Sequence, residues 1–272
     1  MNVLAGKVAA VTGAASGLGR AMALAFAEEG MDLALADVNE LGSVETALRR
    51  LGRKAFSMRV DVSRGADVEA FAEAAVRELG AVHVVCNNAG VALSGAAWEN
   101  SEDEWRWILG VNLWGVVHGV RAFAPRLIAQ NEGHIVNTAS VAGLISPPGM
   151  GAYSVTKHAV VALSECLHHD LRERGSPVGV SVLCPAYVPT GIADSVPPVS
   201  VAKSRERLVK EASLKKAVAA GKLSADEVAR AVVAAVKQDR FYVLTHPAIK
   251  GAIRARLEDI LNDRAPRNPL AL

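Results

Sequence analysis

Short apolar runs alternate along most of the chain with longer segments that have helical spacing. Strands buried on both faces of a parallel sheet are apolar throughout and lack a strict period of two. Six runs rich in Val, Ala and Leu have this character and are predicted strands: residues 8–13, 32–37, 55–62, 82–88, 134–140 and 178–185. Residues 241–245 are a seventh candidate strand.

Helical spacing of apolar residues fills the intervals between these runs, as at residues 18–29 and 66–79. A further helix is expected to begin at Ser101, because Ser101 and Glu104 have the S-x-x-E form of a capping box. Residues 252–261 are the last predicted helix.

Strand and helix alternate without a linker from residue 7 to residue 185. Short connections of this kind produce right-handed crossovers and a doubly wound sheet. We therefore predict an α/β fold with a parallel seven-stranded sheet and helices on both faces, in one domain over residues 1–272. Residues 192–222 begin Pro-rich and continue charged and helix-prone, and we expect them to form a lid segment over one edge of the sheet.

The charge of the chain argues against a polyanionic partner. Its 30 Lys and Arg residues stand against 28 Asp and Glu residues, with both signs spread along the chain, so no basic face for nucleic acid is expected. No apolar stretch approaches the ~18 residues that a membrane span requires, and we expect no secretory leader. These features predict a soluble cytoplasmic protein with a small-molecule partner, and no nucleic acid or membrane partner.

The sequence offers no clear metal site. Cys86, Cys166 and Cys184 are odd in number and lack C-x-x-C spacing, so we expect small buried hydrophobes and not ligands or bridges. His168 and His169 are adjacent, but no third ligand lies nearby in the sequence, and an exposed helix surface is the preferred interpretation.

A glycine-rich turn follows the first predicted strand. Residues 12–19 read TGAASGLG, with G-x-x-x-G-x-G spacing, and a helix follows directly. Glycines in such a turn let the backbone approach a pyrophosphate, and the first N–H groups of the helix point at its charge. The alternative is a turn whose glycines serve tight packing alone.

Asp37 ends the second predicted strand, eighteen residues after Gly19. An acidic residue at this place accepts hydrogen bonds from the adenosine ribose hydroxyls of a dinucleotide. A 2′-phosphate there would meet a like charge, and two unit charges 4 Å apart repel by about 4 kcal/mol at an effective dielectric of 20. The sequence therefore favours NAD over NADP, unless Asp37 is only a solvated carboxylate at the end of a strand.

Tyr153 and Lys157 are four residues apart on a predicted helix and so share one face. A phenol is a poor base at neutral pH, and a neighbouring ammonium favours the phenolate, so we expect Lys157 to lower the pKa of Tyr153. Ser140 ends the fifth predicted strand, where its hydroxyl is placed to bind a substrate oxygen.

Together these motifs resemble the short-chain dehydrogenase/reductase family over residues 5–265. The residues that carry the resemblance occur in the family's order: TGAASGLG at 12–19, Asp37, Asp61-Val62, NNAG at 87–90, Asn112, Ser140, Tyr153, Lys157 and the segment 185–190. The resemblance implies a single-domain Rossmann fold and hydride transfer between NAD and a secondary alcohol or ketone.

The resemblance also implies roles for single residues. Tyr153 would be the general acid and base, Ser140 would polarise the substrate oxygen, Lys157 would also hold the nicotinamide ribose, and Asn112 would extend a proton relay through water to Lys157. The implied cofactor-binding residues are Gly13, Ser16, Gly17, Leu18, Gly19, Asp37, Asp61, Val62, Asn88, Ala89, Gly90, Tyr153, Lys157, Pro185, Val188 and Thr190. Two purely structural alternatives remain. In the first, the Asn112 side chain donates instead to a carbonyl of its own helix, and in the second, Asp61 only caps a turn.

One position departs from the family pattern. Ala186 stands where a glycine usually follows the proline, and alanine restricts φ where the backbone must pass close to the nicotinamide. The contacts implied for Val188 and Thr190 depend on this segment.

The substrate pocket is expected to be apolar. Its predicted walls are the lid segment together with Val91, Leu93, Val141, Leu144, Met150 and Tyr187. Such walls favour an apolar or aromatic substrate over a sugar. The lid segment also carries basic residues, which either recognise an acidic group or form a solvated helix face: Lys203, Arg205, Arg207, Lys210, Lys215, Lys216 and Lys222.

Two other functions stay open at this stage. One is an NADPH-dependent ketoreductase that acts on a carrier-linked or quinone substrate. The other is a dinucleotide-sensing protein without catalysis. The helices predicted within residues 105–128 and 159–171 are apolar on more than one face, and similar proteins pair these helices, so we expect a homodimer or homotetramer.

Overall fold

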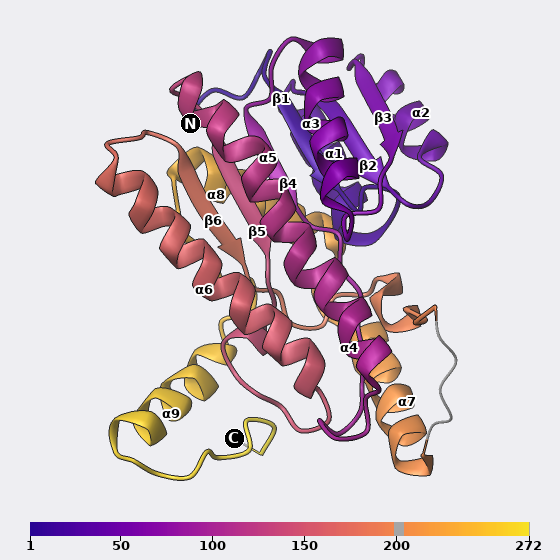
Figure 1. Ribbon diagram of the computed structural model, residues 1–272, viewed down its shortest axis with the longest axis vertical. Coiled ribbons are helices and arrows are strands. Elements are labelled where there is room, and N and C mark those ends of the chain that lie inside the picture. Colours follow the sequence, from indigo (N-terminus) through magenta and orange to yellow (C-terminus); the bar gives the residue numbers. More distant parts are fainter. Residues whose placement is uncertain (199–203, 272) are drawn as a thin grey trace.

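The computed structural model describes residues 1–198 and 204–271. Its centre is one parallel seven-stranded sheet with the order β3-β2-β1-β4-β5-β6-β7 (Figure 1). The strands are β1 (Val8–Thr12), β2 (Asp32–Asp37), β3 (Ala55–Arg59), β4 (Val84–Asn87), β5 (His134–Thr138), β6 (Gly179–Leu183) and β7 (Tyr242–Val243). The predicted α/β fold with a doubly wound sheet is confirmed.

The central strands are apolar throughout because each side of the sheet faces a different core. In β1, Ala9 and Val11 pack into a cluster with helix residues such as Phe26. Their neighbours Val8 and Ala10 pack into the opposite cluster with residues such as Phe71. Burial on both faces explains why these strands lack alternation between polar and apolar residues.

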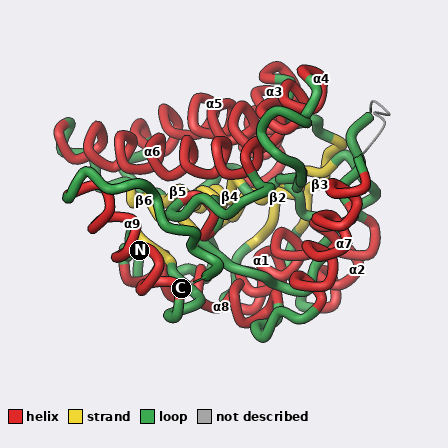
Figure 2. The backbone as a smooth tube through the Cα atoms, turned by 90° about the horizontal axis from the view of Figure 1, so that it is seen from below, coloured by secondary structure: helices red, strands yellow, loops and turns green. Residues whose placement is uncertain are grey.

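Two layers of helices cover the sheet (Figure 2). Helices α3, α5 and α6 supply the cluster on one face, and α1, α2 and α8 supply the cluster on the other. The helices are α1 (Gly17–Glu28), α2 (Gly42–Arg50), α3 (Gly65–Leu79), α4 (Glu102–Leu109), α5 (Gly115–Ala129), α6 (Gly151–Glu173), α7 (Arg205–Ala219), α8 (Ala225–Gln238) and α9 (Ile249–Leu261).

Some element boundaries differ from the sequence prediction. Helix α2 was not predicted, because it is short and buries only Val44 and Leu48. The strand predicted at 55–62 ends at Arg59, and residues 60–62 continue as a loop. The capping box at Ser101 is confirmed, since the Ser101 side chain accepts from the Glu104 amide and the Glu104 side chain accepts from the Ser101 amide.

The lid segment contains helix α7, which lies beside α4 (Figure 1). Lys203, one of its predicted basic residues, lies outside the described residues. Among the described residues, 1–198 and 204–271, no helix is both long and apolar enough to cross a membrane.

The predicted burial of the cysteines and exposure of the adjacent histidines hold for some of these residues and not for others. Cys86 and Cys184 are buried as predicted, but Cys166 is exposed on α6, because its position falls on the outer face of that helix. Within residues 1–198 and 204–271 no cluster of His, Cys, Asp or Glu is arranged to hold a metal ion. His169 is exposed, whereas His168 is half-buried with its ring 5.2 Å from that of Phe241.

The chain changes direction across the sheet at the pair β1 and β4. From β1 the order proceeds through β2 and β3 to one edge, and from β4 through β5, β6 and β7 to the other. In doubly wound sheets a ligand binds beside the carboxyl ends of the strands at such a reversal. A ligand site is therefore expected beside the loops that follow β1 and β4.

Candidate active site

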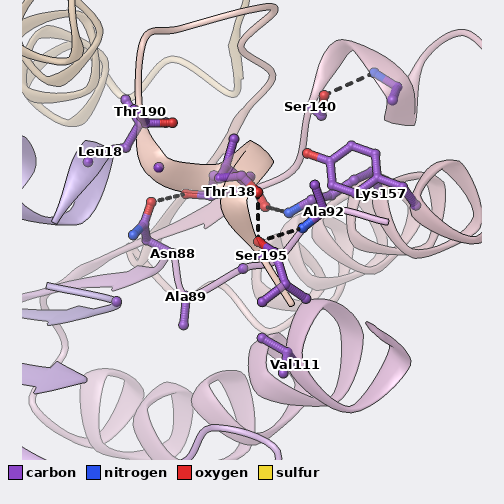
Figure 3. Close-up of a pocket in the computed structure, with 18 of the residues that line it drawn as sticks. Leu18, Asn88, Ala89, Ala92, Val111, Thr138, Ser140, Lys157, Thr190 and Ser195 are labelled. Atoms are coloured by element: carbon purple, nitrogen blue, oxygen red, sulfur yellow. Dashed lines mark hydrogen bonds between the residues drawn. The ribbon is translucent and has the colours of Figure 1, made fainter. Parts of the chain in front are cut away.

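A cavity of about 1160 Å³ lies at this edge of the sheet (Figure 3). It is bordered by the loops that follow β1, β2, β3, β4, β5 and β6, and by parts of α4, α6 and α7. Every predicted site residue lines it except Gly19 and Asn112. The strand ends therefore bring together residues that are far apart in the sequence.

The glycine-rich turn requires its glycines for steric reasons. Gly13 and Gly17 have φ of +66° and +52°, a region that residues with a side chain rarely adopt. A Cβ on Gly19 would overlap the Gly13 carbonyl oxygen, so Gly19 serves the packing of the turn and does not line the cavity. Helix α1 begins directly after Ser16, with no side-chain cap and no acidic residue in its first turn.

Asp37 is held by hydrogen bonds at the cavity wall. Its Oδ2 accepts from the Ala15 amide at 2.9 Å, and its Oδ1 accepts from the backbone amide and the side chain of Asn39 at 2.9 and 3.1 Å. The side chain is 8% exposed and lines the cavity. The carboxylate is therefore a fixed negative group and not a freely solvated end of a strand.

Asn88 and Thr12 tie the ends of three strands together. The Asn88 amide donates to Thr12 Oγ1 at 2.9 Å, and the Asn88 side chain donates to the Thr12 carbonyl at 3.0 Å. Thr138 Oγ1, at the end of β5, donates to Asn88 Oδ1 at 3.3 Å (Figure 3). Asn88 thus fixes the floor of the cavity at the reversal of the sheet.

Asp61 both lines the cavity and caps a turn. Its Oδ1 accepts from the amide and hydroxyl of Ser63 at 3.0 and 2.7 Å. The carbonyl of Val62 is held by His118 Nδ1 of α5 at 2.9 Å. His118 carries no sequence motif, so sequence reasoning missed this support of the loop.

The side chains of Ser140 and Tyr153 lie together at the carboxyl end of β5, where both line the cavity. Ser140 Oγ accepts from the Ala142 amide at 3.1 Å and donates to the Pro185 carbonyl at 3.3 Å. Burial raises the pKa of Tyr153 to about 12, and the neighbouring Ser140 hydroxyl opposes this shift only in part. The expected lowering of the Tyr153 pKa is therefore not found in the protein alone.

Lys157 is buried one helical turn after Tyr153. Its Nζ donates to the Thr138 carbonyl at 2.8 Å and lies 5.7 Å from the centre of the Tyr153 ring. The ammonium therefore lies over the phenol ring. Burial lowers the pKa of Lys157 to about 8, because the charged form loses its hydration.

Asn112 lies in a π-helical turn, Gly110–Trp114, that joins α4 to α5. Its Oδ1 accepts from the Val91 amide at 2.8 Å, and its Nδ2 donates to the Val91 carbonyl at 2.9 Å and to Thr156 Oγ1 at 3.2 Å. A Cβ on Gly90 would lie 3.4 Å from Asn112 Oδ1 and 3.6 Å from Lys157 Nζ. The side chain of Asn112 therefore clamps the loop after β4 close to Lys157, and the alternative of a back-bond within its own helix is not observed.

The segment after β6 tolerates Ala186. The residues other than glycine with positive φ among the described residues are Asn131, Asp239 and Asp263, so Ala186 stays outside the left-handed region. Its amide donates to His246 Nδ1 at 3.2 Å. His246 thus supports this segment from the loop that precedes α9, a contact without any sequence signal.

One part of the cavity wall, which we call the substrate end, is mostly apolar. Val91, Val141, Met150 and Tyr187 line it as predicted. Leu93 and Leu144 do not, because Leu93 is buried in a hydrophobic cluster with Ile108, and Leu144 packs against a different cluster that contains Val160. Sequence reasoning missed several wall residues that lack a motif: Trp107, Ile145, Ile249, Pro269 and Leu270.

The residues present fit a dinucleotide. The glycine turn and the start of α1 offer a concave wall with backbone N–H groups for a pyrophosphate. The Asp37 carboxylate is fixed at the far side of that turn, and Lys157 is fixed beside the Ser140–Tyr153 pair. Asp37 would therefore bind one half of a dinucleotide, and Lys157 would bind the other half within the same cavity.

Comparisons with known proteins agree with this arrangement. Residues 7–199 match the family described as short chain dehydrogenase. A crystal structure of a short chain dehydrogenase/reductase from Burkholderia phymatum in complex with NAD superposes with a TM-score of 0.97, at 51% identity over 100% of both chains.

Two curated relatives extend over nearly the whole chain. The CLA biosynthesis dehydrogenase/reductase of Lactiplantibacillus plantarum is 32% identical over 96% of this chain and 95% of its own length. The 1-deoxy-11-beta-hydroxypentalenate dehydrogenase of Streptomyces avermitilis is 34% identical over 94% of this chain and 88% of its own length. The chain therefore belongs to the short-chain dehydrogenase/reductase family.

Proposed function

We propose that this protein transfers hydride reversibly between NAD(H) and a bulky, uncharged secondary alcohol or ketone. One observation carries the proposal: Ser140, Tyr153 and Lys157 line the same cavity as the glycine turn, Asp37 and the apolar substrate end. The NAD complex of the related structure and the names of the two dehydrogenase relatives support it.

The cofactor supplies the hydride acceptor or donor when it is bound. Asp37 receives the ribose hydroxyls of the adenosine half, and its fixed charge disfavours a 2′-phosphate. The first amides of α1 and the turn around Gly17 bind the pyrophosphate. The loops with Asp61-Val62 and Asn88–Gly90 contact the adenosine half, and the segment with Pro185, Val188 and Thr190 contacts the nicotinamide.

Tyr153 moves the proton in this proposal. Because its pKa is about 12, the phenol is protonated at neutral pH and can donate to the oxygen of a ketone. Ser140 binds the same oxygen through its hydroxyl, which lies beside Tyr153. Lys157 binds the nicotinamide ribose, and Asn112 holds the loop beside it.

The substrate end supports an uncharged molecule. Among the described residues, the cations that line the cavity are Lys157 and Arg106. The Arg106 side chain is 68% exposed and pairs with Glu102 and Asp103. A carboxylate or a phosphate of an acyl carrier would find no buried cation free for it at this end of the described cavity.

A panel of alcohols and ketones tests the proposal by the absorbance of NADH. We expect turnover of cyclic and aryl secondary alcohols with NAD, and little turnover of sugar alcohols. A preference for NADPH with carrier-linked or quinone ketones would establish the ketoreductase alternative. NAD binding without turnover of any compound would overturn the enzymatic proposal in favour of a dinucleotide sensor.

We also propose that the protein forms a homodimer or homotetramer. Trp114 and Val155 are each 50% exposed. Trp114 lies in the π-helical turn and Val155 lies on the neighbouring helix α6. Apolar side chains of this size on adjacent helices are typical of a subunit interface.

A further inference from the structure

Arg207, in the first turn of α7, is buried to an unusual degree. Its side chain is 1% exposed, and it is among the largest fully buried side chains of the described residues. An arginine is rarely removed from water because its guanidinium is always charged. Such burial requires a partner that replaces the lost hydration.

That partner is Glu104, in the first turn of α4. Both guanidinium Nη atoms donate to the Glu104 carboxylate, with Nη1 to Oε2 at 3.0 Å and Nη2 to Oε1. The Glu104 side chain is also 1% exposed. Burial alone would raise the pKa of Glu104, but the hydrogen bonds from Arg207 and the Ser101 amide give a net lowering.

The contact is built from both sides. Glu104 Oε2 also accepts from the Ser101 amide at 3.0 Å, which completes the capping box and fixes the carboxylate. Glu211 Oε1 lies 3.5 Å from Arg207 Nε on the next turn of α7. The Arg207–Glu104 pair is therefore a preorganised fork-to-fork contact and not an exposed surface ion pair.

The same face of α7 forms part of the cavity wall. Arg207, Leu214 and Val218 are separated by seven and four residues, so they lie along one side of the helix. Leu214 and Val218 both line the cavity. Other polar contacts of this helix are exposed: Ser204, its N-cap residue, donates to Glu99 Oε1 at 2.8 Å, and Lys215 Nζ lies 2.8 Å from Asp194 Oδ1.

Helix α4, which carries Glu104, also contributes to the wall of the cavity. Trp107, one turn after Glu104, lines the cavity, and it packs with Leu214 in one hydrophobic cluster. The ion pair therefore joins two helices that both contribute side chains to the wall of the cavity.

We propose that the Arg207–Glu104 pair sets the width of the substrate end by fixing α7, so that Arg207 is a positioning residue that determines specificity for bulky substrates. Loss of the pair releases Leu214 and Val218 from the wall, and bulky substrates lose contacts that small ones never make. The substrate part of this inference rests on the proposed function, whereas the anchoring of α7 does not.

Three variants test the inference. Arg207→Ala removes the anchor, and Arg207→Lys keeps the charge but loses the fork. Glu206→Gln, at an exposed position of the same helix, is the matched control, because it leaves every trypsin site of α7 in place. If Arg207→Ala fails to fold, Glu104→Gln replaces it, because its amide oxygen still accepts from the Ser101 amide.

Limited trypsin digestion reports the anchoring of α7 without any substrate. We expect cleavage within α7, at Lys210, Lys215 or Lys216, to be at least about tenfold faster in Arg207→Ala than in the wild type. NAD affinity, measured by calorimetry, should stay unchanged. Digestion of Arg207→Ala at the wild-type rate would overturn the inference.

Kinetics report the width of the wall. For Arg207→Ala we expect kcat/KM for a bulky cyclic alcohol to fall at least about tenfold through KM, and kcat/KM for isopropanol to change less than about twofold. For Arg207→Lys, kcat/KM for the bulky alcohol should lie between the values of the wild type and Arg207→Ala. Added guanidinium ion should partly restore this kcat/KM in Arg207→Ala. An equal loss for both alcohols would show a merely structural role and overturn the inference.

The two proposals can fail separately. If the wild type turns over no alcohol or ketone, the proposed function fails, and the digestion result alone decides whether Arg207 anchors α7. If the wild type is active but the ratio between bulky and small alcohols is the same in all variants, the function stands and the specificity role is wrong.

Discussion

The Ala15 amide donates to Asp37 Oδ2 at 2.9 Å, so the carboxylate at the end of β2 also holds the glycine-rich turn after β1. One residue thus fixes the turn for the pyrophosphate and places a negative charge where the ribose is expected. Cofactor choice and the geometry of the turn are therefore coupled through a single side chain.

Replacement of Asp37 by asparagine should weaken the preference for NAD. The substituted amide keeps an oxygen for the Ala15 amide but removes the charge that repels a 2′-phosphate. We expect the ratio of kcat/KM for NAD over NADP to fall at least about tenfold, or about 1.4 kcal/mol, in initial-rate assays with both cofactors. Asp32→Asn, at the other end of the same strand, should leave the ratio unchanged. An unaltered ratio in Asp37→Asn would contradict the role of the charge.

Replacement of Tyr153 by phenylalanine should stop turnover and spare binding. The variant keeps the ring over Lys157 but has no hydroxyl to move a proton, so kcat should fall by about 10²–10⁴ or more. Calorimetry should find NAD affinity close to that of the wild type. Tyr242→Phe, on the edge strand β7, is the control and should stay active. Substantial turnover by Tyr153→Phe would contradict the role of Tyr153 in proton transfer.

Stability should depend on pH through Lys157. Burial lowers its pKa from 10.5 to about 8 in the folded protein. Between these values the unfolded chain still binds the proton that the folded protein has released, so the free energy of unfolding rises with pH in this window. Relative to Lys157→Met, the wild type should gain about 2 kcal/mol between pH 7 and pH 10, measured by urea unfolding.

The comparison with Lys157→Met isolates this effect. Tyr153, whose pKa is about 12, is present in both proteins, so its own contribution cancels in the difference. A stability difference that stays constant from pH 7 to pH 10 would show that Lys157 titrates normally.

Replacement of Gly19 by alanine should damage the turn. The new Cβ would overlap the Gly13 carbonyl oxygen, a backbone atom that cannot move aside cheaply. We expect a loss of about 1–3 kcal/mol in the free energy of unfolding, together with weaker NAD binding. Gly251→Ala on α9, where nothing lies within 4 Å, should instead gain about 0.5–1 kcal/mol. Similar stability of the two variants would contradict the close contact.

Sedimentation should find two or four chains. At micromolar concentration we expect a species of twice or four times 28.5 kDa, and Val155→Glu should reduce it by placing a charge in the interface. Val209→Glu, on the exposed side of α7, is the control and should leave the mass unchanged. A wild-type species of 28.5 kDa would show that the protein is a monomer.

Local chemistry made much of the fold predictable. The strands around Ala9 and Leu33 are apolar on both faces because two cores cover them, and that pattern is readable in one dimension. The glycine turn was recognised from its spacing between a strand and a helix, and the structure adds that Gly13 and Gly17 have a positive φ, which only glycine readily adopts. Helix α2 escaped prediction because two buried residues in nine do not make a detectable repeat.

The sequence by itself determined the class of fold, the glycine turn, and the spacing that aligns Tyr153 with Lys157, because each depends on residues near one another in the chain. Tertiary structure decided what depends on distant partners. It raised the pKa of Tyr153 by burial and set Asn112 against Val91. It also turned Arg207 from an apparent surface cation into a buried partner of Glu104. Burial and pairing are properties of the assembled chain, and charge counts or periodicity carry no trace of them.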